Sequence, residues 1–159
     1  MDFPLITIDG NLISSLEECF ENYQKPKKII DDSCPNCKNI EMIAIYIILE
    51  IPPVLIINLK RVGEQSIYNH YIKIPHQLDM GKVIKNFINF SPSIYELRGF
   101  IKNNGDEYSG HNYSVLKNMF DDNWYINNDN YICRCINESE KSNDIVFLCY
   151  IKTLSQSKI

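Results

Sequence analysis

The chain lacks any long run of basic residues. Lys and Arg total 16 among 159 residues, and the formal net charge is −4. The densest basic cluster, residues 25–28, is a short Lys-Pro-Lys-Lys segment of the kind found in solvated turns. Because nucleic-acid-binding proteins carry a basic stripe or patch, we predict no nucleic-acid partner.

Long apolar runs are also missing. The most apolar stretch, residues 43–59, is interrupted by Glu50, Pro52, Pro53 and Asn58. A helix that crosses a bilayer needs about 20 consecutive apolar residues, so this stretch predicts two core strands and no membrane span. Residues 1–4 lack the basic start and apolar segment of a secretory signal. The six cysteines therefore predict free thiols or a metal in a reducing intracellular compartment, cytoplasmic or nuclear, rather than disulfides.

What is present predicts one α+β domain over residues 1–159, with one helix before a series of short strands. Apolar residues recur with a helical period over 12–23, with Ser14 or Ser15 as N-cap and a glutamate near the third helical position. Residues 25–38 are a polar connection. The strands predicted from β-rich runs, which would form an antiparallel sheet, are 42–49, 54–61, 71–74, 95–101, 113–117, 124–126 and 145–151.

One histidine stands in a pattern that suggests catalysis. His111 follows Gly110, and an Asn128-Asp129 pair comes 17 positions later, just after a Trp-Tyr pair. Two antiparallel strands would bring these residues together. A histidine base serves a nucleophile, and an orienting side chain fixes its tautomer through the other ring nitrogen. We predict His111 as the base and Asn128 as its orienter.

Several short motifs occur in one order along the chain. They are LEECF (Leu16–Phe20), a Cys-x-x-Cys pair, PVLIINLKR (Pro53–Arg61), IPHQLDM (Ile74–Met80), YEL (Tyr95–Leu97), Gly110-His111, WYINND (Trp124–Asp129) and FLCY (Phe147–Tyr150). This ordered set resembles the ubiquitin-specific proteases, papain-like cysteine peptidases that cut after the C-terminal glycine of ubiquitin. The resemblance implies a papain-like fold, here the antiparallel palm sheet with part of the fingers, and ubiquitin or a ubiquitinated protein as partner.

The resemblance also implies roles for particular residues. His111 falls on the general base and Asn128 on the third triad position. Asp129 falls on the acidic position that supports the oxyanion site or the active-site water. Residues 62–70 and 103–109 match the two blocking loops that close over the ubiquitin tail. The positions that carry over to the tail channel are Leu59, Val62, Asn103, Gly110 and Asn112.

The sequence departs from the family pattern at the tail channel and at its beginning. Val62, Asn103, Asn112 and Asn127 replace family residues that would grip an extended tail. The family's nucleophilic cysteine lies N-terminal to every landmark found here. We therefore expect the C-terminal half of the domain, inactive alone, with an N-terminal half-domain as a possible partner. We also expect an exposed apolar sheet face and self-association of the isolated chain. A ubiquitin-binding or scaffolding remnant without catalysis is the alternative.

The cysteines offer no substitute nucleophile by this reasoning. Cys19 and Cys149 lie in apolar segments and are expected in the core. Cys34 and Cys37 have the spacing of half a zinc site, and tetrahedral zinc needs four ligands. The pair is either completed by a second Cys pair from elsewhere or an empty relic, and we favour the relic. No cofactor is required. A small zinc-binding β-domain unrelated to ubiquitin is the third hypothesis.

Overall fold

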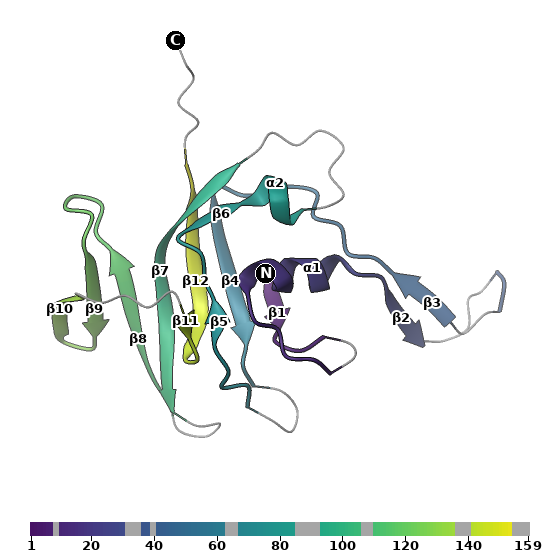
Figure 1. The fold of residues 1–159 in the computed structure, drawn as a ribbon, viewed down its shortest axis with the longest axis horizontal. Helices are drawn as coiled ribbons and strands as arrows, with labels where there is room; N and C mark the ends of the chain where they lie inside the picture. Colours follow the sequence, from purple (N-terminus) through teal and green to yellow (C-terminus); the bar gives the residue numbers. More distant parts are fainter. Residues whose placement is uncertain are drawn as a thin grey trace, which may run out of the picture.

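The computed structural model describes residues 1–7, 10–30, 36–38, 41–62, 67–84, 93–105, 110–135 and 141–153. In this part of the chain the dominant feature is an eight-stranded sheet (Figure 1). In spatial order its strands are β1 (Asp2–Pro4), β4 (Val54–Lys60), β12 (Ile145–Lys152), β7 (Ile94–Gly105), β8 (Gly110–Lys117), β9 (Trp124–Asn128) and β10 (Tyr131–Cys135), and β6 (Gln77–Asp79) pairs with β7. Neighbouring strands are antiparallel except for β1 and β4, which are parallel.

The two faces of this sheet differ because side chains alternate along each strand. One face, which we call the core face, carries buried cross-strand neighbours: Ile57, Leu148, Phe100 and Val115. The opposite, outer face carries exposed apolar residues: Val54, Ile56, Ile101, Leu116, Phe147 and Ile151. Ile56, Ile101, Leu116 and Phe147 border a hollow of about 290 Å³ beside Gly99. An exposed apolar sheet face, expected from the sequence, is therefore present, whereas self-association stays a prediction.

Helix α1 (Leu16–Gln24) packs beside β1. The rings of Phe3 and Phe20 meet edge to face with centroids 4.8 Å apart. Ser15 is the N-cap, and its Oγ accepts a hydrogen bond from the Glu18 backbone N–H at 3.2 Å. The Glu18 carboxylate accepts in turn from the Ser14 N–H at 2.8 Å. The predicted capping glutamate is confirmed. Its carboxylate accepts from the Ser14 N–H, one residue before the N-cap N–H that is the usual partner in a capping box.

The helix begins at Leu16, directly after the predicted N-cap Ser15, although the apolar period starts at residue 12. Residues 12–15 are not helical, because their backbone groups pair elsewhere. The Ile13 N–H donates to the Leu5 carbonyl at 3.0 Å, and the Lys73 N–H donates to the Ser14 carbonyl at 2.8 Å. The apolar residues that set the helical period, among them Cys19, still face the core, as predicted.

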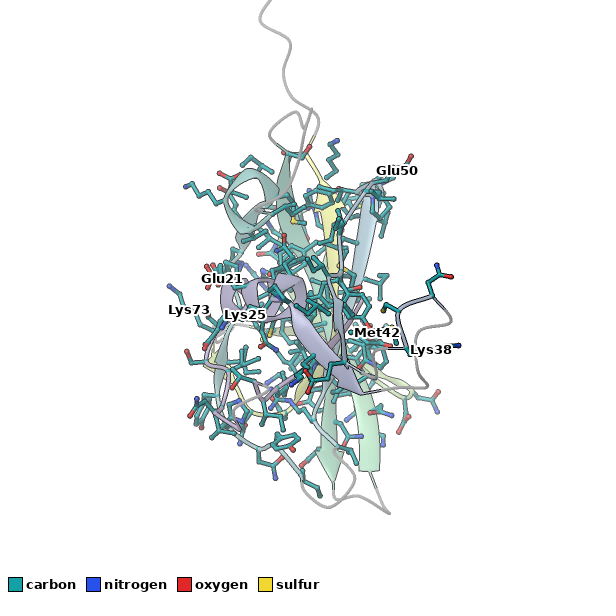
Figure 2. The ribbon with its side chains drawn as sticks, turned by 90° about the vertical axis from the view of Figure 1, so that its right-hand side faces the viewer. Glu21, Lys25, Lys38, Met42, Glu50 and Lys73 are labelled. Atoms are coloured by element: carbon teal, nitrogen blue, oxygen red, sulfur yellow. The ribbon has the colours of Figure 1, made fainter. Side chains whose placement is uncertain are left out.

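Two small sheets and a short helix complete the described structure. β2 (Lys27–Ile30) and β3 (Glu41–Ala44) form an arm that extends away from the main sheet (Figure 1). Figure 2 views the molecule from this side, with Met42 and Lys38 to the right of Glu21 and Lys25. The other elements are β5 (Ile72–Lys73), which pairs with β11 (Lys141–Ser142), and α2 (Met80–Val83). No helix among the described residues is long and apolar enough to cross a membrane.

Several local predictions were wrong, each for a tertiary reason. Residues 27–30 are a strand of the arm rather than part of a polar connection, and the strand predicted at 42–49 ends at Ala44. Residues 103–105 continue β7 and do not form a loop, because β8 pairs with them as far as Gly110. Cys149 is half-buried on the outer face rather than in the core. The strands β1, β2, β6, β10 and β11 were not predicted.

Gly99 offers a direct test of packing on the outer face. A Cβ at this position would lie 2.5 Å from Leu116 Cδ2 and 3.1 Å from the Val115 carbonyl oxygen. We expect Gly99→Ala to lower the free energy of unfolding by about 1–3 kcal/mol through overpacking. In a Leu116→Ala background the loss should be smaller, since one clash is gone. Urea denaturation measures both values, and equal losses in the two backgrounds would contradict this packing.

Candidate active site

The pairing of β8 with β9 brings His111 and Asn128 together. Ser114 lies opposite Asn127, so the next pair along would be Tyr113 and Asn128. His111 is two residues before Tyr113 and therefore projects from the same face, as a diagonal neighbour of Asn128. The structure shows a short hydrogen bond between His111 Nε2 and Asn128 Oδ1.

This hydrogen bond determines the chemistry of the ring. An amide oxygen can only accept a hydrogen bond, so Nε2 carries the proton. Neutral His111 then keeps its lone pair on Nδ1. The side chain is 49% exposed, so a group from outside the described residues can approach it. The arrangement can therefore accept a proton at Nδ1 while Asn128 holds the ring in place.

Asp129 lies in the two-residue turn between β9 and β10. Its φ of 51° is in the left-handed region, which Asp tolerates better than most residues. Asp129 Oδ2 is 3.7 Å from His111 Nε2, and the Asp129 side chain is 77% exposed. An ion pair this exposed contributes little in water. The predicted role of Asp129 at an oxyanion site stays a prediction.

Three of the predicted channel residues form one cluster next to His111. Asn103 and Asn112 are cross-strand partners on the outer face, and Asn103 Nδ2 donates to Asn112 Oδ1 at 2.8 Å. A Cβ at Gly110 would lie 2.6 Å from Asn103 Nδ2, so a larger residue there would require this amide to move. Asn103 and Asn112, two residues that differ from the family pattern, thus contact each other directly, on the face of the sheet opposite to the His111 side chain.

The other channel candidates, Leu59 and Val62, lie near the end of β4 and just after it. Leu59 is buried in the core opposite Phe3, and Val62 is exposed and pairs with Ile67. Residues 63–66 and 106–109, which make up much of the two predicted blocking loops, lie outside the described residues. The channel role of all five residues stays a prediction.

Sequence reasoning gave Arg61 no role of its own, although it is buried. The sequence did carry a signal for this burial. Leu55, Ile57 and Leu59 alternate toward the core, and position 61 continues the series. A charged residue at a core position of a strand marks a site where polar partners must be supplied.

The described cysteines are poor candidates for a nucleophile beside His111. Burial, followed by the nearby charges of Glu18 and Glu17, raises the pKa of the Cys19 thiol to about 12. Burial also raises the pKa of Cys149. Both thiols therefore stay protonated and unreactive at neutral pH. Cys133 lies opposite Ile126, two strands away from His111 and farther along the sheet.

The predicted zinc half-site is only partly described. Cys34 lies outside the described residues, and Cys37 is exposed at the end of the arm. Among the described residues no group of three or more His, Cys, Asp or Glu side chains could hold a metal ion. A structural zinc here would need further ligands, as predicted from the sequence.

The tautomer of His111 is directly measurable. We expect long-range ¹H–¹⁵N spectra of neutral His111 to show a protonated Nε2 and an unprotonated Nδ1, because Asn128 Oδ1 accepts from Nε2. Asn128→Ala removes the acceptor and should give a mixture of tautomers, whereas Asn128→Asp should keep the single form. A wild-type ring protonated at Nδ1 would contradict the geometry.

Comparisons with known proteins agree with this fold and identify the family. A model of the family described as ubiquitin carboxyl-terminal hydrolase matches residues 13–151. Ubiquitin carboxyl-terminal hydrolases 5 and 9 of Arabidopsis thaliana are 27% and 29% identical to the chain over 152 residues. The alignments cover 90% and 87% of this chain but only 16% of each relative.

Solved structures show the same fold. A yeast SAGA DUB module with a mutant Sgf73 matches with a TM-score of 0.78 at 22% identity, covering 96% of this chain and 35% of that chain. A SAGA DUB module bound to monoubiquitin matches with a TM-score of 0.75 at 22% identity and the same coverage. The predicted papain-like α+β fold is confirmed. Because the family model covers most of its length, the chain belongs to the ubiquitin carboxyl-terminal hydrolase family.

Proposed function

We propose that this chain carries the proton-transfer half of a cysteine-type deubiquitinase. The observation that carries the proposal is the hydrogen bond between His111 Nε2 and Asn128 Oδ1, with Nδ1 left as the accepting nitrogen. The family match supports hydrolysis at the carboxyl terminus of ubiquitin. The related module whose title states that it is bound to monoubiquitin supports ubiquitin as the partner.

The proposed reaction is acyl transfer through a thioester. His111 Nδ1 accepts the proton of a cysteine thiol, and the thiolate attacks the carbonyl carbon of the last ubiquitin glycine. Protonated His111 then gives this proton to the departing amine as the carbon–nitrogen bond breaks. In the second half His111 takes a proton from water, which attacks the thioester and releases ubiquitin and the thiol. Asn128 keeps the ring oriented throughout.

The nucleophilic thiol of this proposal comes from a part of the protein, or of a partner, that lies outside the described residues. Cys19 and Cys149 have a raised pKa, and Cys133 and Cys135 lie on β10, two strands away from His111. The chain spans 35% of the solved chains it matches, so relatives of this fold have further polypeptide that could supply the thiol. An N-terminal half-domain, on the same chain or as a partner, is the form that we propose. The site would then act in the cytoplasm or the nucleus.

A second candidate function is ubiquitin binding without hydrolysis. The observation in its favour is the exposed Asn103–Asn112 pair, which is next to His111 along the strand but on the opposite face of the sheet. Side-chain amides both donate and accept hydrogen bonds, so this pair can bind the backbone of an extended tail without any nucleophile.

Hydrolysis of ubiquitin carrying a C-terminal fluorogenic amide separates the two candidates. The assay uses the native-length protein that contains this chain. We expect His111→Ala to lower kcat/KM by about 10³-fold, the order of a general acid–base contribution.

His76→Gln is the matched control, because His76 is exposed and contacts Trp124 rather than the site. It should leave kcat/KM unchanged. Binding of ¹⁵N-labelled ubiquitin with no hydrolysis by the native-length protein would contradict the enzymatic proposal and support the second candidate.

A further inference from the structure

Arg61 is a buried charge at the end of β4 that holds two separate segments. It is 5% exposed. Its Nε donates to the Ile145 carbonyl at 2.6 Å, and its Nη1 donates to the carbonyls of Tyr68 and His70 at 2.8 and 3.1 Å. A buried guanidinium is tolerated only when hydrogen bonds replace water, so these carbonyls are held close to it.

The acceptor on β12 sits at an irregularity of the sheet. The pairing of β12 with β7 shifts register between Ile145 and Phe147. Ile145 lies beyond the last residue of β12 that pairs with β4, Phe147, and its carbonyl accepts from Arg61 Nε. Burial lowers the pKa of Arg61, and the nearby carboxylate of the preceding residue, Asp144, raises it again in part.

Asp144 carries the connection onward to β7. Its carboxylate lies 3.3 Å from Lys102 Nζ, and its carbonyl accepts from the Asn103 N–H at 2.9 Å. Asn103 in turn contacts Asn112 and lies over Gly110, the residue before His111. A continuous series of contacts therefore runs from residues 68–70 through Arg61 to the strand that carries His111.

The series crosses the lower end of the sheet in Figure 1, where β4 and β7 end and where β12 and β8 begin. At the usual strand spacing of about 4.8 Å, the three steps from β4 to β8 cover roughly 14 Å. The described segments that flank this end, 67–70, 102–105 and 110–112, thus share one internal support.

We propose that Arg61 is a positioning residue, which fixes segment 67–70 relative to the β7–β8 end that carries Asn103, Gly110 and His111. Asp144 is the second member of this link. A displacement at one side of the sheet end is passed to the other through these two residues. The functional consequence rests on the proposed function and on the sequence prediction that residues 62–70 and 103–109 close over the ubiquitin tail.

The link is tested first on the 159-residue chain by ¹H–¹⁵N spectra. We expect Arg61→Met to shift the amide signals of Tyr68 and His70 and also those of Asn103, Gly110 and His111. The matched control is Arg98→Met. Arg98 is a partly buried arginine on the same sheet, and its guanidinium pairs with the carboxylates of Glu96 and Asp122. Arg98→Met should leave the amide signals of Asn103, Gly110 and His111 unchanged.

Shifts confined to residues 61, 68, 70 and 145 would overturn the proposal, as would the same pattern from Arg98→Met. If Arg61→Met does not fold, Asp144→Asn tests the same link with Arg61 intact. It should shift Tyr68 and His70 on one side and Asn103 and Gly110 on the other. Signals of Tyr68 and His70 that stay in place would then overturn the proposal.

A kinetic measurement on the native-length protein separates positioning from simple stability. We expect Arg61→Met to raise KM for a ubiquitin substrate about tenfold with kcat within about twofold, since misplaced binding segments weaken productive binding. Arg61→Lys, which keeps the charge but loses the planar fork, should be intermediate. A lower kcat at unchanged KM would mean fewer folded molecules and would overturn the positioning role. A native-length protein without hydrolase activity would refute the proposed function, while the spectra still decide this inference.

Discussion

The candidate site depends on the register between β8 and β9. Side chains alternate with a period of two, so a slip of one residue would turn Asn128 to the face opposite His111. The register is maintained at several points along the hairpin. Val115 and Ile126 pack toward the core, and the turn at residues 118–123 is closed by a hydrogen bond from the Asn118 N–H to the Asn123 carbonyl at 2.8 Å. Core packing thus determines the geometry of a pair that is itself exposed.

The two polar centres of this sheet end are stabilised in opposite ways. His111 and Asn128 are accessible to water, and their hydrogen bond joins a neutral amide to a ring that can change its protonation. Arg61 is buried and keeps its charge, because backbone carbonyls replace its water. A fixed buried charge suits a support, whereas an exposed titratable ring suits proton transfer. The structure places the rigid centre three strands away from the reactive one.

Much of the fold could be predicted from local pattern, and the exceptions have physical causes. The alternation along residues 54–60 and the Ser15 cap were sufficient to place β4 and α1. β1 and β2 are too short for a periodic signal, and Gly105 belongs to a strand only because β8 pairs with it. The proximity of His111 and Asn128 followed from their spacing on adjacent strands. The environment of Arg61 did not, because its partners come from segments 7 to 84 residues away.

We predict that His111 accepts a proton from a cysteine thiol that the described residues do not provide. The most direct test is to treat native cell extract with ubiquitin bearing a C-terminal thiol-reactive group, and then to detect this chain with an antibody. We predict that the protein detected by the antibody, or a polypeptide that co-purifies with it, gains the mass of one ubiquitin and fails to do so after alkylation of thiols. If neither gains this mass, in protein shown to be folded, the account is contradicted.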